Sequence, residues 1–222
     1  MHNYMEWTYI QQAIPQFLDA FWITLKLSVF GIIGAIIVGL AVTMVTYFRL
    51  PGRMLANGYQ SIALNTPLLI QLFFIYYGLP PLGIKIPAEL TAIIGLTFLG
   101  GAYMAKVFTG GILAIDKIQI ESGHAIGLSK FQMAKYVLIP QGLLFSLPGV
   151  AANIIFLIKE TSIFTVIAVP EITNTTLDLI GQNYRTDEYL TMMIVAYAAI
   201  LVPLSVLLTL AERKIRHVAI SV

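Results

Sequence analysis

The sequence ESGHAIGLSKFQMAKYVLIP, residues 121–140, is a polar stretch in a chain that is otherwise strongly apolar. Hydrophobic residues make up 58% of the 222 residues, and charged residues make up only 11%. In this stretch, by contrast, Glu121, His124, Lys130 and Lys135 fall close together. Apolar segments long enough to span a membrane lie on both sides, so we expect a loop at a membrane face. A charged loop in this position favours contact with a partner over a simple connection between helices.

Five segments are long and apolar enough to span a bilayer, which requires about 20 mostly apolar residues. They are residues 20–48, 54–79, 89–115, 141–169 and 189–211. The mean hydropathy of +0.85 agrees with a helical membrane protein. The sequence therefore predicts an all-α membrane protein with five transmembrane helices.

The positions of Lys and Arg predict the orientation, because cytoplasmic loops carry an excess of positive charge. One set of loops, which includes the polar loop and the C-terminus, holds eight of these residues: Arg49, Arg53, Lys117, Lys130, Lys135, Arg213, Lys214 and Arg216. The other set holds only Lys85 and Arg185. We therefore expect the N-terminus to be outside and the C-terminus to be cytoplasmic.

The chain divides into a short N-terminal segment and a membrane domain. Residues 1–19 alternate apolar and polar side chains and contain no Lys or Arg. This pattern predicts an external amphipathic segment that lies at the membrane surface. We expect residues 20–222 to form a single transmembrane domain, with the polar loop at about residues 116–140.

Lys26, Lys106, Lys159 and Glu160 fall inside the predicted spans, where a charged residue costs roughly 2.5–3.5 kcal/mol on insertion. Lys26 lies near the outer end of the first span, where its side chain can extend to the interface. Lys106 and Glu160 are candidates for a structural ion pair between helices or for a polar route across the membrane. In the second case, Thr161 and Ser162 would add hydroxyl groups beside Lys159 and Glu160.

The second span is interrupted by Asn65, Thr66 and Pro67. Pro67 lacks a backbone donor and favours a kink, which leaves carbonyl groups in need of new partners. Gln71 lies four residues further on the same helix face and adds a polar group there. The break serves either helix packing or a polar route. In the third span, small residues predict close helix packing; they are Gly95, Gly100, Gly101, Gly110 and Gly111.

Several function classes are excluded by missing motifs. The chain has no GxxxxGK[ST] phosphate loop, no GxGxxG after a strand and no grouped nucleophile, base and acid. It contains no cysteine, and its three histidines are far apart, so a metal site is not expected. We expect no enzyme activity and no cofactor in this chain. Uphill transport would need an ion gradient or a separate ATPase.

The polar loop has the signals of two short helices. Residues 121–126 are amphipathic, and Gly127 can adopt the left-handed conformation that ends a helix. Ser129 is a good N-cap for a second helix over Lys130–Val137, which we expect Pro140 to stop. Such a pair of helices would present a knob to a soluble partner.

The loop resembles the EAA loop of ABC-transporter permeases. The shared features are Glu121-Ser122-Gly123, then Gly127 after three residues, then Val137-Leu138-Ile139-Pro140 after nine more. The whole chain resembles the polar amino acid uptake branch of that family. The matching stretches are Thr24-Leu25-Lys26-Leu27-Ser28, Asn65-Thr66-Pro67-Leu68-Leu69, residues 71–78, Gly101-Ala102-Tyr103, Gly110-Gly111-Ile112, Pro140-Gln141 and Lys159-Glu160-Thr161-Ser162.

The resemblance implies a type I ABC importer transmembrane fold in a multi-pass protein of the bacterial inner membrane. It implies three partners: a cytoplasmic ATPase dimer that carries ATP and Mg²⁺, an external solute-binding protein, and a second permease subunit in a homodimer or heterodimer. Lipid surrounds the chain, and no nucleic-acid partner is expected. The ATPase would be contacted by Glu121, Ser122, Gly123, Gly127 and Leu128. The solute path would include Asn65, Thr66, Glu160, Thr161 and Ser162, to which the polar side chains of Gln71 and Lys106 are added.

The chain departs from the family pattern near this path. Leu64 replaces the usual Arg before Asn-Thr-Pro, Lys106 replaces the usual Glu, and Thr109 replaces the usual Arg. Ile118 replaces a Gly, and Ser122 and Gly123 replace two alanines of the loop motif. An altered substrate preference or a specialised heterodimer subunit would fit these changes. Two other functions stay open from the residues: an ion-coupled secondary carrier that uses the intramembrane charges, and a scaffold that recruits a soluble protein.

Overall fold

The computed structural model describes residues 6–220, and in this range the protein contains helices and turns but no strand. The α-helices are α1 Trp7–Tyr47, α2 Arg53–Asn65, α3 Leu68–Phe73, α4 Ala88–Leu113, α5 Lys117–Ala125, α6 Lys130–Met133, α7 Ile139–Glu160, α8 Ile172–Asn183 and α9 Thr186–Ile220. The shorter segments are the π-helices η1 Phe74–Gly78 and η3 Ala134–Leu138 and the 3-10 helices η2 Pro80–Leu82 and η4 Thr161–Ile167.

Within the described part of the chain, four stretches of helix are long and apolar enough to cross a membrane: α1, α4, the run Lys130–Ile167 and the part Thr186–Ile215 of α9. A fifth span results if α2 and the helical run Leu68–Leu82 are counted together, although they are bent by 110° relative to each other. The predicted all-α fold with five spans is therefore confirmed. The predicted break of the second span is also confirmed, since α2 ends at Asn65 and α3 begins at Leu68.

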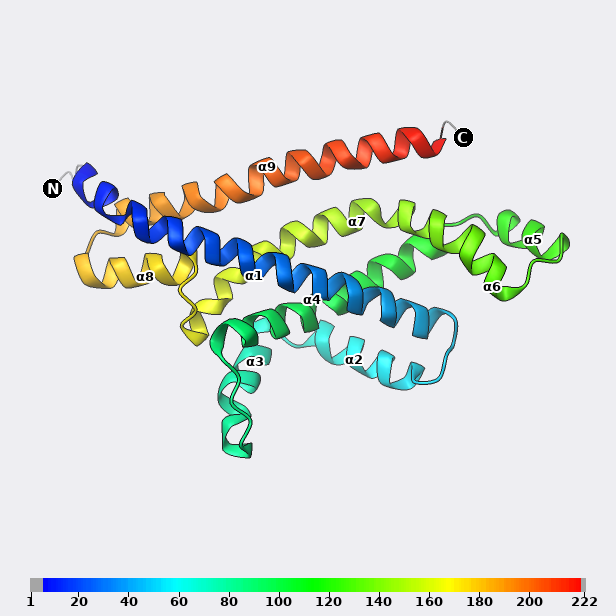
Figure 1. The fold of residues 1–222 in the computed structure, drawn as a ribbon, viewed down its shortest axis with the longest axis horizontal. Coiled ribbons are helices and arrows are strands. Elements are labelled where there is room, and N and C mark those ends of the chain that lie inside the picture. The colour runs from blue at the N-terminus through cyan, green and yellow to red at the C-terminus, as the bar shows by residue number, and fades with distance from the viewer. Residues whose placement is uncertain (1–5, 221–222) are drawn as a thin grey trace.

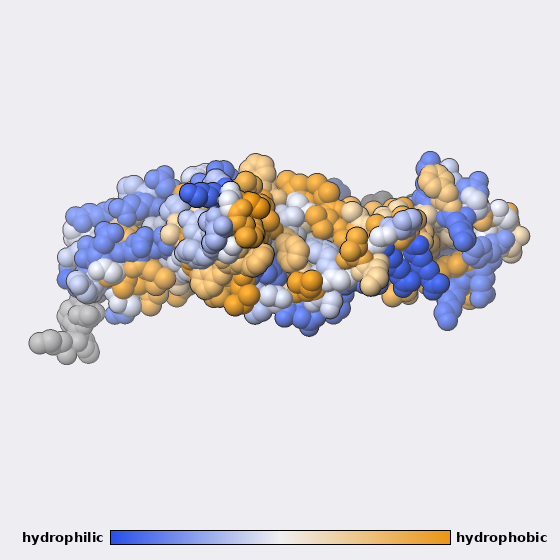
Figure 2. All heavy atoms as spheres, turned by 90° about the horizontal axis from the view of Figure 1, so that it is seen from below, coloured by the Kyte–Doolittle hydropathy of each residue, from blue (hydrophilic) through white to orange (hydrophobic). Residues whose placement is uncertain are grey.

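The long helices α1, α4, α7 and α9 run along the long axis of the molecule (Figure 1). Helices α5 and α6 lie at one end, called the loop end below, and α8 lies at the other, called the α8 end. Helix α3 and the segment after it project sideways from the bundle (Figure 1). Figure 2 shows hydrophobic atoms gathered over the middle of one face and hydrophilic atoms concentrated at both ends. This distribution fits a bundle whose long axis crosses a membrane.

Helix α1 extends further toward the N-terminus than the predicted first span. Residues 1–5 lie outside the described residues, and Trp7–Asp19 form the first part of α1 without interruption. One side of this part is covered by protein, since Ala13 and Phe17 share a buried cluster with Ile172 of α8 and Tyr189 of α9. The segment expected as an external amphipathic element is therefore continuous with the first span.

Helix α4 lies at the centre of the bundle and packs against α1 and α7. Leu96 and Met104 of α4 are fully buried together with Leu27 of α1 and Leu157 of α7. Because lipid is as apolar as these side chains, close packing matters more than the hydrophobic effect in holding the helices together. Gly100 lies directly against Leu157. The glycines predicted to serve packing do so at 95, 100, 101 and 111, but Gly110 has no neighbour within 4 Å of its would-be side chain.

At the α8 end, the buried carboxylate of Glu171 joins two helices, α8 and α9. It caps α8 by accepting hydrogen bonds from the backbone N–H groups of Thr173 at 2.9 Å and Asn174 at 2.6 Å. It also accepts a hydrogen bond of 3.1 Å from the Tyr197 hydroxyl of α9. Burial raises the pKa of Glu171 to about 7, although these hydrogen bonds oppose the shift. Helix α8 lies between the predicted spans 141–169 and 189–211, where no helix was predicted.

The helix that begins at Lys130 does not end at Pro140, contrary to the expectation from the sequence. Helix α6 continues through η3 into α7. Proline lacks an N–H group, and its ring crowds the carbonyl group four residues earlier. That carbonyl belongs to Tyr136 in the π-helical turn, whose wider spacing accommodates the ring. Pro140 therefore marks a change of helix geometry rather than a stop.

Candidate functional site

The break in the second span brings polar groups to the side of the bundle. Thr66 has an extended backbone, with φ −121° and ψ 125°, which interrupts the helix before Pro67. Gln71 compensates for part of the interruption, since its side-chain amide donates to the carbonyl groups of Ala63 at 3.2 Å and Thr66 at 2.9 Å. The amide nitrogen of Gln71 is thus used within the chain, while its amide oxygen is buried with no hydrogen-bond partner among the described residues. Its role here is to stabilise the break.

A pocket of about 430 Å³ lies beside this break and is called the polar pocket below. Its lining comes from the α2–α3 junction, from α4, and from α7 with η4. The lining residues are Leu64, Asn65, Thr66, Pro67, Leu68, Leu99, Tyr103, Phe156, Glu160 and Ile163. The volume falls in the range usual for small-molecule sites. A carboxylate, an amide, a hydroxyl and a phenol converge here on otherwise apolar walls.

Three of the predicted path residues share the polar pocket, and four do not line it. Asn65, Thr66 and Glu160 are brought together although they come from opposite halves of the chain. Thr161 is fully buried and donates to the carbonyl group of Ile158. Ser162 donates to the carbonyl group of Lys159.

The two remaining path residues are Gln71 and Lys106. The side-chain amide nitrogen of Gln71 is already bonded to carbonyl groups at the break, as described above. Lys106 is exposed on α4. The alternative prediction of a Lys106–Glu160 ion pair is not met, because the ion pairs among the described residues are Lys26–Glu89 and Arg185–Glu6.

The aromatic walls of the polar pocket were not predicted as site residues. Tyr103 of α4 and Phe156 of α7 have ring centroids 5.2 Å apart, and both line the pocket. Tyr103 lies four residues after Leu99, so the two share one helix face. That spacing was visible in the sequence, but the pairing of α4 with α7 was not.

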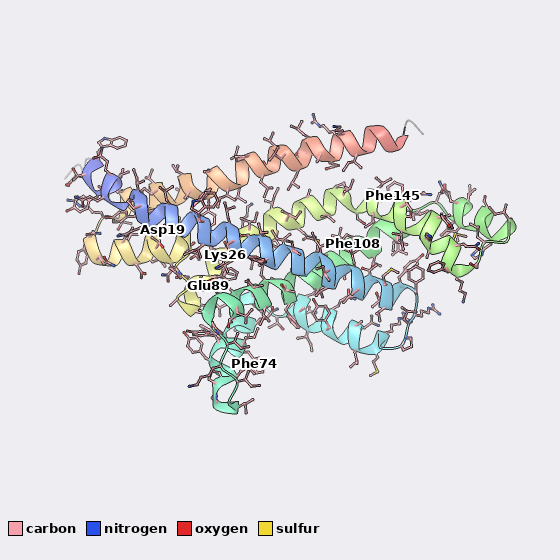
Figure 3. The ribbon with its side chains drawn as sticks, viewed as in Figure 1. Asp19, Lys26, Phe74, Glu89, Phe108 and Phe145 are labelled. Carbon is pink, nitrogen blue, oxygen red and sulfur yellow. The ribbon has the colours of Figure 1, made fainter. Side chains whose placement is uncertain are left out.

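Lys26 was expected to extend to the membrane interface, and its exposed ammonium group forms an ion pair of 2.7 Å with Glu89, which was not predicted. The two residues lie side by side on α1 and at the start of α4 (Figure 3). Both side chains are about half exposed, so the pair contributes at most about 1 kcal/mol in water. The ion pair links α1 to the first turn of α4.

The polar loop forms the predicted pair of short helices. Helix α5 is capped by the Asp116 carboxylate, which accepts from the N–H of Ile118 at 3.0 Å. The helix ends at Ala125 and is terminated by Gly127, whose φ of 79° is left-handed, as predicted. The N–H groups of Gly127 and Leu128 donate to the carbonyl groups of His124 and Gly123, both at 3.0 Å, which is the Schellman arrangement.

Helix α6 starts at the predicted cap. The Ser129 hydroxyl accepts from the N–H of Gln132, and the Gln132 side chain accepts from the N–H of Ser129, which completes a capping box. Gly123 of α5 is buried directly against the end of Met133 of α6. A large side chain at position 123 would therefore push the two helices apart.

The loop is packed firmly onto the end of the bundle. Met133 and Leu138 share a buried cluster with Ile112 and Ile115 at the end of α4. On its outer side the loop exposes apolar side chains, with Ile126 77% and Phe131 75% exposed. A hollow of about 370 Å³ is lined there by Ile118, Gln119, Ser122, Gly123, Ile126, Leu128 and Val137. The loop is thus both an exposed surface and an extension of α4.

Four of the residues predicted to contact an ATPase reach this surface. Glu121, Ser122 and Gly127 are exposed, and Leu128 is half-buried. Gly123 is buried from solvent against α6, although it forms part of the hollow. Among the described residues, no group of three or more His, Asp or Glu could hold a metal ion.

Comparisons with known proteins agree on one class. Residues 31–217 match the model of the family described as binding-protein-dependent transport system inner membrane component. The chain is 32% identical over 217 residues to the glutamine transport system permease protein GlnP of Escherichia coli (strain K12), which covers 95% of this chain and 98% of GlnP. It is 32% identical over 206 residues to the arginine transport system permease protein ArtQ of Bacillus subtilis (strain 168), which covers 91% of this chain and 94% of ArtQ.

Solved structures give the same result for the fold. A chain in the crystal structure of an amino acid ABC transporter with histidines superposes with a TM-score of 0.89 and 28% identity, covering 95% of this chain and 99% of that chain. A chain of the MetNI methionine ABC transporter in an inward-facing conformation gives a TM-score of 0.71 at 21% identity, and covers 92% of this chain and 96% of that chain.

Proposed function

Because this chain belongs to the family of binding-protein-dependent transport system inner membrane components, we propose that it carries a polar amino acid across the membrane by way of the polar pocket. The chain is the membrane subunit of an ATP-driven importer and a multi-pass protein of the inner membrane. It is not the enzyme of that importer, since ATP hydrolysis belongs to a separate subunit. The family also works with a second permease subunit and a binding protein.

The observation that carries the proposal is the convergence of Glu160, Asn65 and Thr66 on one pocket within the membrane spans. The Glu160 carboxylate can accept hydrogen bonds from an ammonium group, and such charge-assisted bonds are among the stronger ones. Asn65 already donates to the carbonyl group of Ser61 at 2.8 Å, so its amide oxygen remains for a donor on the solute. Tyr103 and Phe156 give the pocket apolar walls.

The names of the relatives support the solute class. GlnP is a glutamine transport permease and ArtQ is an arginine transport permease. Both amino acids carry an ammonium group, a carboxylate and a polar side chain. Which polar amino acid this chain carries depends on the binding protein as well as on the pocket.

We further propose that the exposed loop surface contacts the ATPase through Glu121, Ser122, Gly127 and Leu128, with Gly123 holding α5 against α6. Movement of α5 would pass to α4 through the cluster of Met133, Ile112 and Ile115. ATP and Mg²⁺ would bind in that partner. The charge distribution of the loops supports a cytoplasmic position for this surface.

The experiment is uptake of radiolabelled amino acids into proteoliposomes that contain this chain with its ATPase and binding protein. The binding protein is first screened for thermal stabilisation by each of the twenty amino acids and cystine. We expect ATP-dependent accumulation of at least one polar amino acid that stabilises the binding protein. Accumulation driven by a proton or sodium gradient without ATP would overturn the proposal.

A further inference from the structure

Lys106 is an exposed cation in the C-terminal half of a membrane-spanning helix. It lies in α4, and its side chain is exposed in the isolated chain. Among the described residues its ammonium group has no ion pair and no hydrogen bond. A charge facing lipid at this depth costs several kcal/mol, so such residues face water or an opposite charge. Since no carboxylate of the described residues meets Lys106, its ammonium group faces water or a charge supplied from outside the described residues.

The position of Lys106 on α4 connects it with the polar pocket. Leu99 and Tyr103 line the pocket, and Lys106 follows them at a spacing of four and then three residues. Residues at this spacing occupy one helix face. Lys106 is thus one turn beyond Tyr103 in the direction of the loop end.

The register between α4 and α7 gives the separation of Lys106 and Glu160 along the helix axes. The two helices are antiparallel, with Gly100 against Leu157 and Gly149 against Val107. Glu160 therefore lies opposite about residue 97, roughly nine residues from Lys106, which corresponds to about 13 Å along the helices. Side chains lean toward the N-terminus of their own helix. In antiparallel helices, Lys106 and Glu160 therefore lean toward each other, and this shortens the gap between their charges.

We propose that Lys106 is a specificity-determining residue that binds the carboxylate of the solute as it passes from the polar pocket toward the loop end. The inference rests on the proposed function and assigns it one more group. Glu160 suits the ammonium group of an amino acid, and Lys106 suits its carboxylate. The order of the two charges favours a solute that carries both over a solute that is only a cation.

A cysteine exchange tests this role, because the native chain contains no cysteine. In Lys106→Cys the thiolate attacks 2-aminoethyl methanethiosulfonate, which forms a disulfide, releases methanesulfinate and restores an ammonium group at about the original length. Methyl methanethiosulfonate forms a neutral disulfide at the same atom. Lys159→Cys is the matched control, since Lys159 is also exposed in a span but does not line the pocket. The cysteine-free wild type controls for thiols in the partner subunits.

The readout is ATP-driven uptake of the amino acid that the wild-type complex accumulates fastest, together with competition by its α-amide, which lacks the carboxylate. We expect Lys106→Cys to lower uptake about tenfold or more, as for loss of a charged hydrogen bond. The aminoethyl reagent restores uptake and the methyl reagent does not. The wild type prefers the amino acid to its amide, and unmodified Lys106→Cys loses this preference. Lys159→Cys keeps wild-type uptake with either reagent.

Several results would overturn the inference. Full uptake by Lys106→Cys, or equal rescue by the neutral reagent, would show that transport needs no positive charge at position 106. A thiol that does not react in the folded complex would show that water does not reach this position. Loss of the second permease subunit from the Lys106→Cys complex would assign Lys106 to subunit pairing instead. If the wild type accumulates no amino acid with ATP, the proposed function itself is overturned. This outcome differs from failure of the inference because it is seen without any change at residue 106.

Discussion

Glu160 is the acidic side chain of the polar pocket, where it lies beside Asn65, Thr66 and Tyr103. If it accepts the ammonium group of the solute, Glu160→Gln keeps the shape of the side chain and removes its charge. We expect uptake to fall about tenfold or more, since a hydrogen bond to a charged group contributes about 1.5–3 kcal/mol. Binding of the ATPase, measured by co-purification, should not change.

The matched control for this prediction is Asp19→Asn. Asp19 is an exposed carboxylate of α1 that does not line the pocket (Figure 3). This variant should transport like the wild type. Wild-type uptake kinetics for Glu160→Gln would remove Glu160 from the solute path.

Glu171 gives the protein a pH-dependent stability at the α8 end. Its pKa rises from an ordinary 4.5 to about 7 because the carboxyl group is buried. The folded state therefore binds this proton more tightly than the unfolded state, so the contribution to stability is complete below about pH 4.5 and is lost as the pH rises to about 7. We expect the free energy of unfolding to fall across this window by about 3 kcal/mol at most.

Glu171→Gln tests this contribution, because glutamine can still accept hydrogen bonds but does not titrate. Thermal unfolding of the purified complex is measured at half-unit steps from pH 4.5 to 8. The difference in melting temperature between wild type and variant should change with pH, with the wild type losing stability relative to the variant toward pH 7. Parallel curves for the two proteins would show that Glu171 has the same pKa in both states.

The polar loop works as one element because α5 and α6 are packed together at Gly123. Any large side chain at 123 would collide with the end of Met133. Since the end of a methionine is flexible, we expect Gly123→Ala to be tolerated and Gly123→Leu to displace α5. Gly123→Leu should then lower uptake strongly while ATP hydrolysis continues.

The double variant Gly123→Leu with Met133→Ala supplies the control, because it makes room for the added side chain. Restored coupling in this variant would identify steric displacement of α5 as the cause. If Gly123→Leu alone transports normally, close packing of α5 on α6 is not needed for coupling.

The elements that could be predicted from the sequence depend on local signals. Pro67 broke the second span where expected, Gly127 adopted a left-handed conformation, and Ser129 capped α6. Each of these follows from the backbone chemistry of one residue and its close neighbours. Pro140 was predicted wrongly, because a π-helical turn in the preceding residues removed the clash that normally ends a helix.

The features that could not be predicted depend on contacts between distant residues. The Lys26–Glu89 ion pair joins α1 to α4, and Tyr103 meets Phe156 across α4 and α7. Helix α8 was missed because it is short and polar and is held by the buried Glu171 contact with α9. Periodicity indicates which face of a helix is apolar, but not which helix will cover it.

On the scale of the whole molecule, the polar pocket and the loop are joined by α4. Tyr103 of this helix lines the pocket, and Ile112 and Ile115 at its end pack against Met133 of the loop. A movement of the loop driven by the ATPase would therefore reach the pocket through a single rigid element. In the proposed function, the loop and the pocket are the two ends of one mechanical connection through α4.

The number of solute molecules taken up per ATP hydrolysed, compared between the wild type and Gly127→Asp, tests this connection most directly. Gly127 has open space around it and a left-handed backbone, which Asp and Asn tolerate better than most residues. Gly127→Asn therefore controls for the backbone, while Gly127→Asp adds a charge to the docking surface. The account predicts that Gly127→Asp lowers the ratio about tenfold or more and that Gly127→Asn stays close to the wild type. An unchanged ratio for Gly127→Asp would contradict it.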